Sequence, residues 1–290
     1  MKFKYLIIVF SIIIIIIILI TALLPLLIAE TETGAELLNG EGIPAAFAVN
    51  FRYITLPLLL FMALLLTGVG IFFFYNYRLL SLLEREDWPA LAYYLEQKIY
   101  IKGKFSNKNV RLLASSYLVI SDYNSVLKLE GKAILAKPSV IEKNALVFGA
   151  ARVLSGNHAD AVSFFKTYMN KGKKAALKKN EVQWLRWFYS FSQLLSGAFK
   201  LAQPEFASLA VTSRDVVISG LSAYFLNNSI SKYSEDPVQC LAAAENGRQR
   251  VVNSLKNIES WDKEINQMSG DIHIAIIRKY INEAGKWIFN

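Results

Sequence analysis

One long apolar run constrains this chain more than any other feature. It extends from Ile54 to Tyr75 and contains no charged side chain. At about 1.5 Å per residue, a helix of this length crosses a hydrocarbon core about 30 Å thick. The sequence therefore predicts a transmembrane helix at 54–75, with residues 76–290 left to form a separate domain.

A second uncharged run precedes it at 5–29, after the two lysines of the first four residues. A cleaved signal peptide ending at Ala29 is the alternative interpretation. Signal sequences usually contain an apolar core of about 7–15 residues, and this run is much longer. The length favours an uncleaved membrane helix, so that 1–75 would form a membrane hairpin with 30–50 as its extracytoplasmic loop.

Lysine and arginine lie mainly on one side of the two runs, and Arg52 is the one basic residue between them. Lys2 and Lys4 precede the first run, Arg78 and Arg85 follow the second, and the loop 30–50 contains neither residue type. Short basic flanks remain in the cytoplasm. The sequence therefore predicts a multi-pass protein of a bacterial-type inner membrane, with both termini and the domain 76–290 in the cytoplasm.

The charge of the chain limits the classes of partner. The net charge is +9, and residues 1–75 hold three basic and four acidic side chains, so the positive charge lies in 76–290. A basic domain favours anionic lipid, an acidic protein or nucleic acid. No nucleic-acid module is visible and the charge is dispersed, which disfavours nucleic acid. The membrane runs make lipid the simplest partner, and the single cysteine, Cys240, excludes an intrachain disulfide.

Apolar spacing after residue 75 is helical, and no stretch alternates as a strand would. Asp87, Trp88 and Pro89 predict a helix start. The expected helices lie at 110–120, 124–136, 139–155, 159–169, 182–196, 198–212, 214–227, 237–257 and 271–288. The fold class predicted is all-α, with two transmembrane helices followed by a solenoid of helical hairpins.

Two consecutive segments, Val110–Pro138 and Ala145–Lys173, align with a shift of 35 residues, and a repeat of this period indicates stacked helical hairpins. Small residues would let helices approach, and aromatic residues would fill the gaps between them. The residues that carry the pattern are Leu113, Ala114, Tyr117, Ala133, Pro138, Gly149, Gly156, Ala161 and Phe165. The pattern resembles tetratricopeptide (TPR) repeats over residues 75–180. Because one such unit cannot bury its own face, the resemblance implies a stacked TPR-like solenoid.

The TPR resemblance also implies a place for a partner. In that family the concave groove is lined by residues of the first helix of each repeat. The matching positions here are Lys108, Arg111, Ser115, Lys143 and Ala150. Some TPR domains hold a terminal carboxylate with paired basic residues and asparagine, whereas this chain has Ser115 and Val147 where asparagine is expected. The resemblance therefore implies a protein partner and puts a carboxylate clamp in doubt.

The remaining histidines, aromatic residues and lysines form no catalytic or metal-binding pattern in the sequence. The two histidines, His158 and His273, are expected to be exposed in a turn and on a helix surface, and no cluster of His, Cys and carboxylates predicts a metal site. No nucleophile elbow or phosphate loop is present, so the sequence predicts neither an enzyme nor a cofactor. The aromatic residues of 184–191 are expected in the core. A basic run is a candidate lipid-facing surface and comprises Lys166, Lys171, Lys173, Lys174, Lys178 and Lys179.

These observations favour a membrane-anchored scaffold or adaptor that binds a protein partner through its cytoplasmic TPR-like domain. Tethering would raise the local concentration of whatever the domain holds. The alternative is a structural subunit of an oligomeric membrane machine for transport, secretion or motility, in which the chain would form a homo-oligomer.

Overall fold

The structure is a computed structural model that describes residues 12, 15–19, 56–172, 179–268 and 270–290. All regular elements in these residues are helical, which confirms the all-α prediction. The chain divides into two compact units, Met1–Asp87 and Trp88–Asn290, so the boundary falls later than residue 75. The predicted first span and its loop lie outside the described residues, except for helical residues 12 and 15–19.

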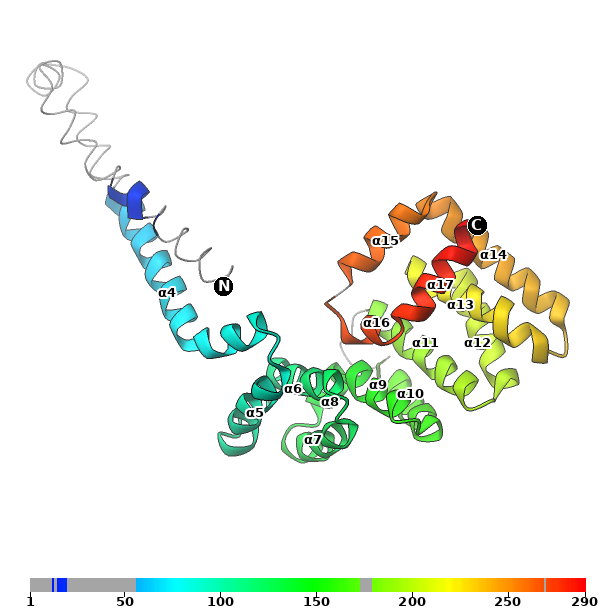
Figure 1. Ribbon diagram of the computed structural model, residues 1–290, viewed down its shortest axis with the longest axis horizontal. Coiled ribbons are helices and arrows are strands. Elements are labelled where there is room, and N and C mark those ends of the chain that lie inside the picture. The colour runs from blue at the N-terminus through cyan, green and yellow to red at the C-terminus, as the bar shows by residue number, and fades with distance from the viewer. Residues whose placement is uncertain (1–11, 13–14, 20–55, 173–178, 269) are drawn as a thin grey trace, which may run out of the picture. The chain divides into compact units, whose positions relative to one another are not determined.

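The first unit contains one long described helix, α4 (Leu56–Glu84), drawn in cyan in Figure 1. Among the described residues, it alone is long and apolar enough to cross a membrane, over Leu60–Glu84. Its apolar side chains are largely exposed, with Leu64 at 71% and Phe74 at 81%. A helix that is apolar on all sides requires an apolar environment. It also continues without a break past Tyr75, where the uncharged run ends.

The second unit is built from short helices that follow one another closely along the chain (Figure 1). Its first half contains α5 (Trp88–Glu96), a π-turn η2 (Gln97–Ile101), α6 (Asn107–Val119), α7 (Tyr123–Ala136), α8 (Ser139–Lys143), α9 (Ala145–Leu154) and α10 (His158–Gly172). Its second half contains α11 (Lys179–Leu195), α12 (Phe199–Thr212), α13 (Val216–Phe225), η3 (Leu226–Ile230), η4 (Ser231–Tyr233), α14 (Pro237–Leu255), α15 (Ile258–Gln267), α16 (Ile272–Ile276) and α17 (Arg278–Phe289).

These helices pair as successive hairpins: α6 with α7, α9 with α10, α11 with α12, and α13 with α14. Each hairpin also contacts the next one. The first helices form one continuous row, because α6 contacts α9, α9 contacts α11, and α11 contacts α13. We call the side of the unit formed by these four helices the first-helix face.

Local sequence signals fix the ends of the hairpin helices. The side chains of Ser106, Asp122 and Asp236 cap α6, α7 and α14 by accepting a hydrogen bond from a backbone N–H of the first turn. The turns after α9 and α11 contain Gly156 and Gly197, with φ of +78° and +79°. Glycine adopts this left-handed conformation without a steric penalty, so the chain can reverse there.

The core of the second unit is rich in aromatic side chains from the first helices. Trp187 of α11 stacks on Phe191 with ring centroids 4.9 Å apart, and Phe191 lies 5.4 Å from Phe225 of α13. Trp184, Trp187, Phe188 and Phe191 are all buried, as expected for a core, whereas Tyr189 is half-buried. Offset and edge-on aromatic pairs stabilise such a core beyond the area they bury.

The residues predicted to pack the repeats lie between neighbouring helices. Buried positions include Leu113, Ala114, Tyr117, Ala133, Ala161 and Phe165. The hydroxyl of Tyr117 donates a hydrogen bond to Glu96 of α5, 2.5 Å away. Pro138 is exposed and starts α8, and exposed Gly156 forms the turn described above. Gly149 of α9 lies directly against the Phe165 ring of α10.

Replacing Gly149 by alanine is expected to lower the free energy of unfolding by about 1–3 kcal/mol, because overpacking forces side chains and backbone to move. A Cβ atom at Gly149 would lie 2.1 Å from Cζ of Phe165. Urea unfolding followed by tryptophan fluorescence measures this change, because all five tryptophans lie in 88–290.

The matched control is Gly131→Ala on α7, where no heavy atom lies within 4 Å of the added Cβ. This change is expected to leave stability unchanged or to raise it by up to about 1 kcal/mol, because alanine favours a helix more than glycine does. Equal losses at Gly149 and Gly131 would contradict the packing described here.

Candidate partner-binding face

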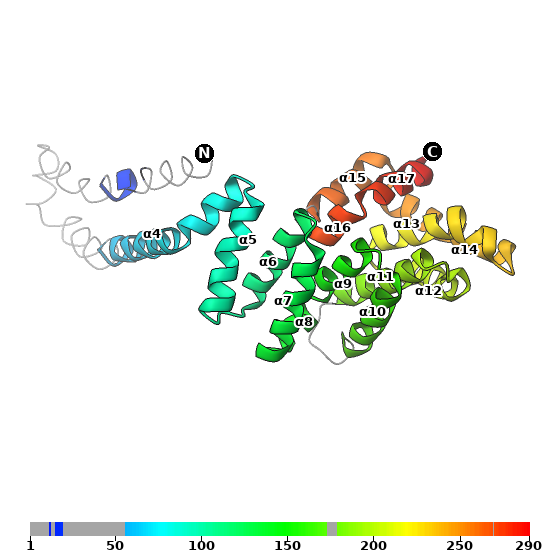
Figure 2. The same ribbon diagram turned by 60° about the horizontal axis from the view of Figure 1, so that its bottom comes forward.

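The C-terminal segment, residues 257–290, lies against the first-helix face. Helix α16 contacts α9, and α17 contacts α13 and α14. Both views draw α17 beside α13 (Figure 2). The ring of Tyr280 lies 5.5 Å from Phe191 and 5.2 Å from Phe225. The segment therefore covers the α11 and α13 part of the face and contacts α9 through α16. It leaves α6, on which Lys108 and Arg111 are exposed, as the open part of the face.

A glycine makes this close packing possible. Gly220 of α13 is so near to Trp261 of α15 and Ile288 of α17 that an added Cβ would lie 2.8 Å from each side chain. Trp261 and Ile288 are almost completely buried. The segment is therefore part of the core of the second unit, and the whole of it cannot leave without exposing these side chains.

One ion pair joins the open part of the face to the C-terminal segment. The guanidinium of Arg111 on α6 donates a hydrogen bond to the carboxylate of Asp271, which precedes α16, at 2.5 Å. The two side chains are 49% and 40% exposed. Because solvent screens exposed pairs, such a pair contributes at most about 1 kcal/mol and can exchange for another carboxylate.

A cavity of about 300 Å³ lies beside this ion pair. Its lining comes from α6, α8, α9, α11 and the C-terminal segment. The charged and polar residues are Arg111, Glu142, Lys143, Asn144, Asn180, Glu181, Asp271 and His273, and the apolar ones include Val147, Trp184 and Leu185. A concave site lined by both apolar and polar side chains is a candidate binding site.

His273 is the buried titratable group of this site. Its ring lies 5.1 Å from the Trp184 ring and 6.2 Å from the Phe188 ring. Burial lowers the pKa of His273 to about 4, with Asp271 opposing the shift and Arg111 adding to it. The expectation that His273 is exposed on a helix surface is wrong, because α16 turns it towards α11. At neutral pH the imidazole is therefore uncharged.

The five predicted groove residues do not all lie at one site in the structure. Arg111 and Lys143 are exposed and line the cavity, and Lys108 is exposed one turn before Arg111 on α6. Ser115 is half-buried on the same helix, and Ala150 is fully buried on α9. The structure thus brings Arg111 and Lys143 together at one site.

The predicted lipid-facing basic run is only partly within the described residues. Lys166 is exposed on α10. Lys171 and Lys179 belong to the ends of α10 and α11. Lys173, Lys174 and Lys178 lie outside the described residues.

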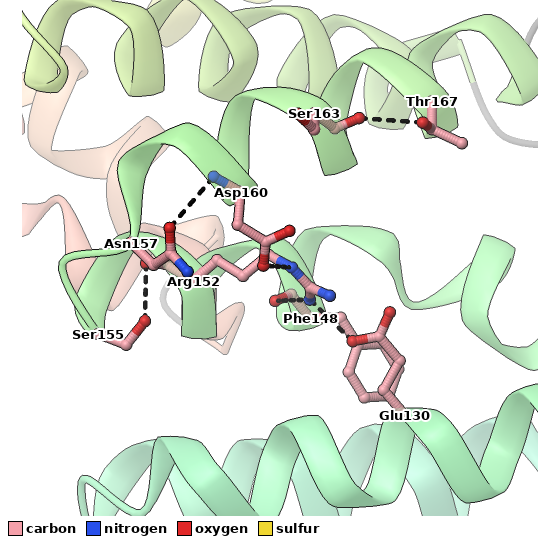
Figure 3. Close-up of polar contacts among 8 residues, drawn as sticks. All are labelled: Glu130, Phe148, Arg152, Ser155, Asn157, Asp160, Ser163 and Thr167. Atoms are coloured by element: carbon pink, nitrogen blue, oxygen red, sulfur yellow. Dashed lines mark hydrogen bonds and ion pairs between the residues drawn. The ribbon is translucent and has the colours of Figure 1, made fainter.

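Sequence reasoning missed a buried ion network centred on Arg152 of α9 (Figure 3). Its guanidinium donates to the carboxylates of Glu130 on α7 at 2.8 Å and Asp160 on α10 at 2.7 Å. The guanidinium also lies 4.2 Å from the centre of the Phe164 ring. Glu130 and Arg152 are mostly buried, with 8% and 12% of their side chains exposed. Arg152 therefore joins two successive hairpins.

Metal-ligating side chains are not clustered in the described residues. No group of three or more His, Cys, Asp or Glu side chains in them is arranged to hold a metal ion. Cys240 is buried, and burial raises the pKa of its thiol, with Asp236 adding to the shift. The polar groups around the cavity are suited to hold a ligand by hydrogen bonds and ion pairs.

Comparison with known proteins places the chain in a family. A family model described as "Uncharacterised Treponema protein" matches residues 125–290, which is more than half of the chain. The chain belongs to this family. A protein of Treponema pallidum (strain Nichols) with the printed name "Uncharacterized protein" is 25% identical over 296 residues, covering 100% of this chain and 88% of that protein. No solved structure matches the chain.

The family match extends from α7 to the end of the chain, so it includes the C-terminal segment. That segment is therefore part of the unit that defines the family. Arg111 lies before the matched region, although the Treponema pallidum relative aligns over the whole chain.

Proposed function

We propose that this protein is a membrane-attached adaptor that holds a protein partner on the open part of its first-helix face. The observation that carries the proposal is the exposed site formed by Arg111 and Lys143 beside the cavity, at the edge of the C-terminal segment. We infer a binding protein rather than an enzyme, because charged and apolar side chains that line one cavity are sufficient to hold a peptide.

The arrangement of hairpins supports a TPR-like solenoid within this proposal. In such an arrangement each hairpin buries the face that its neighbour exposes, and the first helices offer one extended surface. Consecutive contacts along α6, α9, α11 and α13 fit this architecture. In the proposed solenoid, the C-terminal segment fills one end of the surface and leaves the other end to the partner.

Membrane attachment is the second part of the proposal. We infer that 5–29 and α4 form a hairpin in the inner membrane, with both termini and 88–290 in the cytoplasm. The basic flanks support this topology, since the loop 30–50 contains no lysine or arginine. Protease protection in intact cells tests it, and cleavage of 88–290 from the outside would contradict it.

Replacing Arg111 by glutamate is expected to reduce the co-purifying partner about tenfold. A hydrogen bond to a charged group contributes about 1.5–3 kcal/mol, which corresponds to tenfold or more in affinity. The full-length tagged chain is solubilised from its membranes, and the proteins isolated with it are quantified by mass spectrometry. Asp271→Asn is expected to raise the yield, because it releases Arg111 from its internal partner.

The matched control is Lys200→Glu, which also breaks an exposed ion pair, the one with Glu235. Lys200 belongs to α12, a second helix of a hairpin, so the yield of the partner is expected to remain unchanged. If Arg111→Glu and Lys200→Glu have the same effect, the partner does not bind where we propose.

A subunit of an oligomeric membrane assembly is the second candidate, and exposed apolar side chains on α7 favour it. Leu127, Ile134 and Leu135 are exposed by 36%, 43% and 88%. Their spacing places them on one side of the helix. If these side chains join copies of the chain, the detergent-solubilised protein has the mass of a multimer, and Leu135→Lys reduces it to a monomer.

A further inference from the structure

The loop between α5 and α6 concentrates positive charge. We call residues 97–108 the lysine loop. It contains Lys98, Lys102, Lys104 and Lys108, and the sequence has no acidic residue from Gln97 to Ser121. Lys132 of α7 adds a further ammonium group, which lies 3.9 Å from the centre of the Tyr100 ring.

These charges are close enough to affect one another. Partial burial lowers the pKa of Lys98, and repulsion from Lys104, Lys108 and Lys102 lowers it further. The acid that precedes the loop, Glu96, is held by the hydroxyl of Tyr117 at 2.5 Å. Lys102, Lys104 and Lys108 are exposed and make no ion pair in the described part of the chain. The loop therefore presents uncompensated positive charge.

Backbone contacts hold the lysine loop in a defined shape. The N–H of Lys104 donates to the carbonyl of Lys98 at 3.2 Å, and the Asn109 side chain donates to the carbonyl of Lys104 at 3.0 Å. Ser106 caps α6 at the end of the loop. The lysines are thus presented by a structured turn rather than by an extended tail.

Apolar groups accompany the charge. Ile101, at the tip of the loop, is 72% exposed, and Tyr93 on α5 is 59% exposed. Exposed aliphatic and tyrosine side chains among lysines are typical of segments at a membrane surface, where the apolar groups enter the interface and the lysines meet the headgroups.

Chain length limits how far this loop can lie from the proposed membrane helix. Helix α4 ends at Glu84 and α5 begins at Trp88. Three linking residues and one short helix allow a separation of at most about 35 Å between the end of α4 and the tip of the loop. Because tethering raises the effective concentration of a nearby lipid surface, a modest intrinsic affinity is sufficient for docking.

We propose that the lysine loop docks the second unit onto a membrane surface rich in anionic phospholipid. The inference rests on α4 crossing the membrane, as in the proposed function. It assigns to the lysine loop a role separate from the partner site, and it names lipid headgroup phosphates as the groups that Lys102, Lys104 and Lys108 contact.

The test uses the full-length chain in vesicles of phosphatidylcholine alone or of a two-to-one mixture of phosphatidylcholine and phosphatidylglycerol. A nitroxide label on Ile101→Cys reports contact with lipid through its accessibility to oxygen and to a water-soluble nickel chelate. The label is expected to enter the interface of the mixed vesicles and to stay in water on phosphatidylcholine. High salt is expected to release it, because salt screens exposed charges.

The ratio of docked to free second unit is expected to fall by about fivefold for each lysine removed. The variant that tests this combines Lys102→Gln, Lys104→Gln and Lys108→Gln. The control replaces three other exposed lysines, Lys232, Lys263 and Lys279, by glutamine and is expected to change nothing. The inference is overturned if the control has the same effect, or if the label stays in water on both lipids.

Two further outcomes distinguish lipid docking by the lysine loop from membrane attachment of the chain and from binding of nucleic acid. A chain that an alkaline wash removes from the vesicles contradicts membrane attachment, whereas a retained chain whose label stays in water contradicts only the lysine loop. Duplex DNA or RNA is added to the chain in phosphatidylcholine vesicles. Nucleic-acid binding that needs the three lysines, without docking on the mixed vesicles, assigns the loop to nucleic acid and overturns the lipid inference.

Discussion

Replacing Arg152 by methionine is expected to lower the free energy of unfolding of the second unit by about 3–5 kcal/mol. The change removes the partner of Glu130, whose side chain is only 8% exposed, and a buried carboxylate without a partner is strongly destabilising. The variant also loses the contact of the guanidinium with the Phe164 ring. Urea unfolding of the full-length chain in detergent, followed by tryptophan fluorescence, measures the loss.

Two further variants show whether the loss of stability comes from the unpaired Glu130 carboxylate. Glu130→Leu combined with Arg152→Met replaces the pair by apolar side chains and is expected to recover most of the stability. Lys200→Met breaks the exposed pair with Glu235 and is expected to cost less than about 1 kcal/mol. A loss below about 1 kcal/mol for Arg152→Met alone would show that Glu130 reaches solvent and that the network does not join the hairpins.

Acidification from pH 6.5 to pH 4 is expected to destabilise the second unit by about 3 kcal/mol through His273. Burial among Trp184 and Phe188 lowers the pKa of this histidine in the folded protein to about 4, from an ordinary value of 6.5. Between these pH values the unfolded chain binds more protons than the folded one, so stability falls as the pH falls. The contribution is fully present above pH 6.5.

His273→Leu isolates this contribution from those of Asp271 and Arg111, the charged groups near the ring. The leucine variant is expected to lose about 3 kcal/mol less than the unmodified protein over the same pH range, measured by urea unfolding at each pH. Parallel stability curves for the two proteins would contradict the placement of an uncharged His273 against α11.

Much of the fold follows from local patterns that a sequence displays directly. Helical spacing, side-chain caps such as Asp122 and turn residues such as Gly156 are set by neighbours within a few residues. The expected helices therefore agree with α6, α7, α10, α11, α12 and α14 within a few residues at each end. Helix α4 extends beyond the uncharged run, because residues 76–84 continue the helix after that run ends, which is one of the two interpretations that the sequence allows for 76–86.

The candidate site depended on contacts between residues far apart in the sequence. Helix α15 was not predicted, and the expected helix 271–288 is divided into α16 and α17 at Ile277. That division turns His273 towards Trp184, an outcome that local spacing does not encode. Arg111 was singled out as a groove residue, but nothing in its own surroundings indicates that Asp271, 160 residues later, is its partner. Arg152 and Glu130 likewise belong to different hairpins.

Site-specific photo-cross-linking in intact cells tests whether a partner protein contacts the open part of the first-helix face. A photoreactive amino acid is placed at Lys143, which lines the cavity, or at Lys166, which is exposed on the second helix α10. We expect one defined protein to be cross-linked from Lys143, to be absent from Lys166, and to be lost in Arg111→Glu. The same protein cross-linked equally from both positions, or from Lys166 alone, would contradict it.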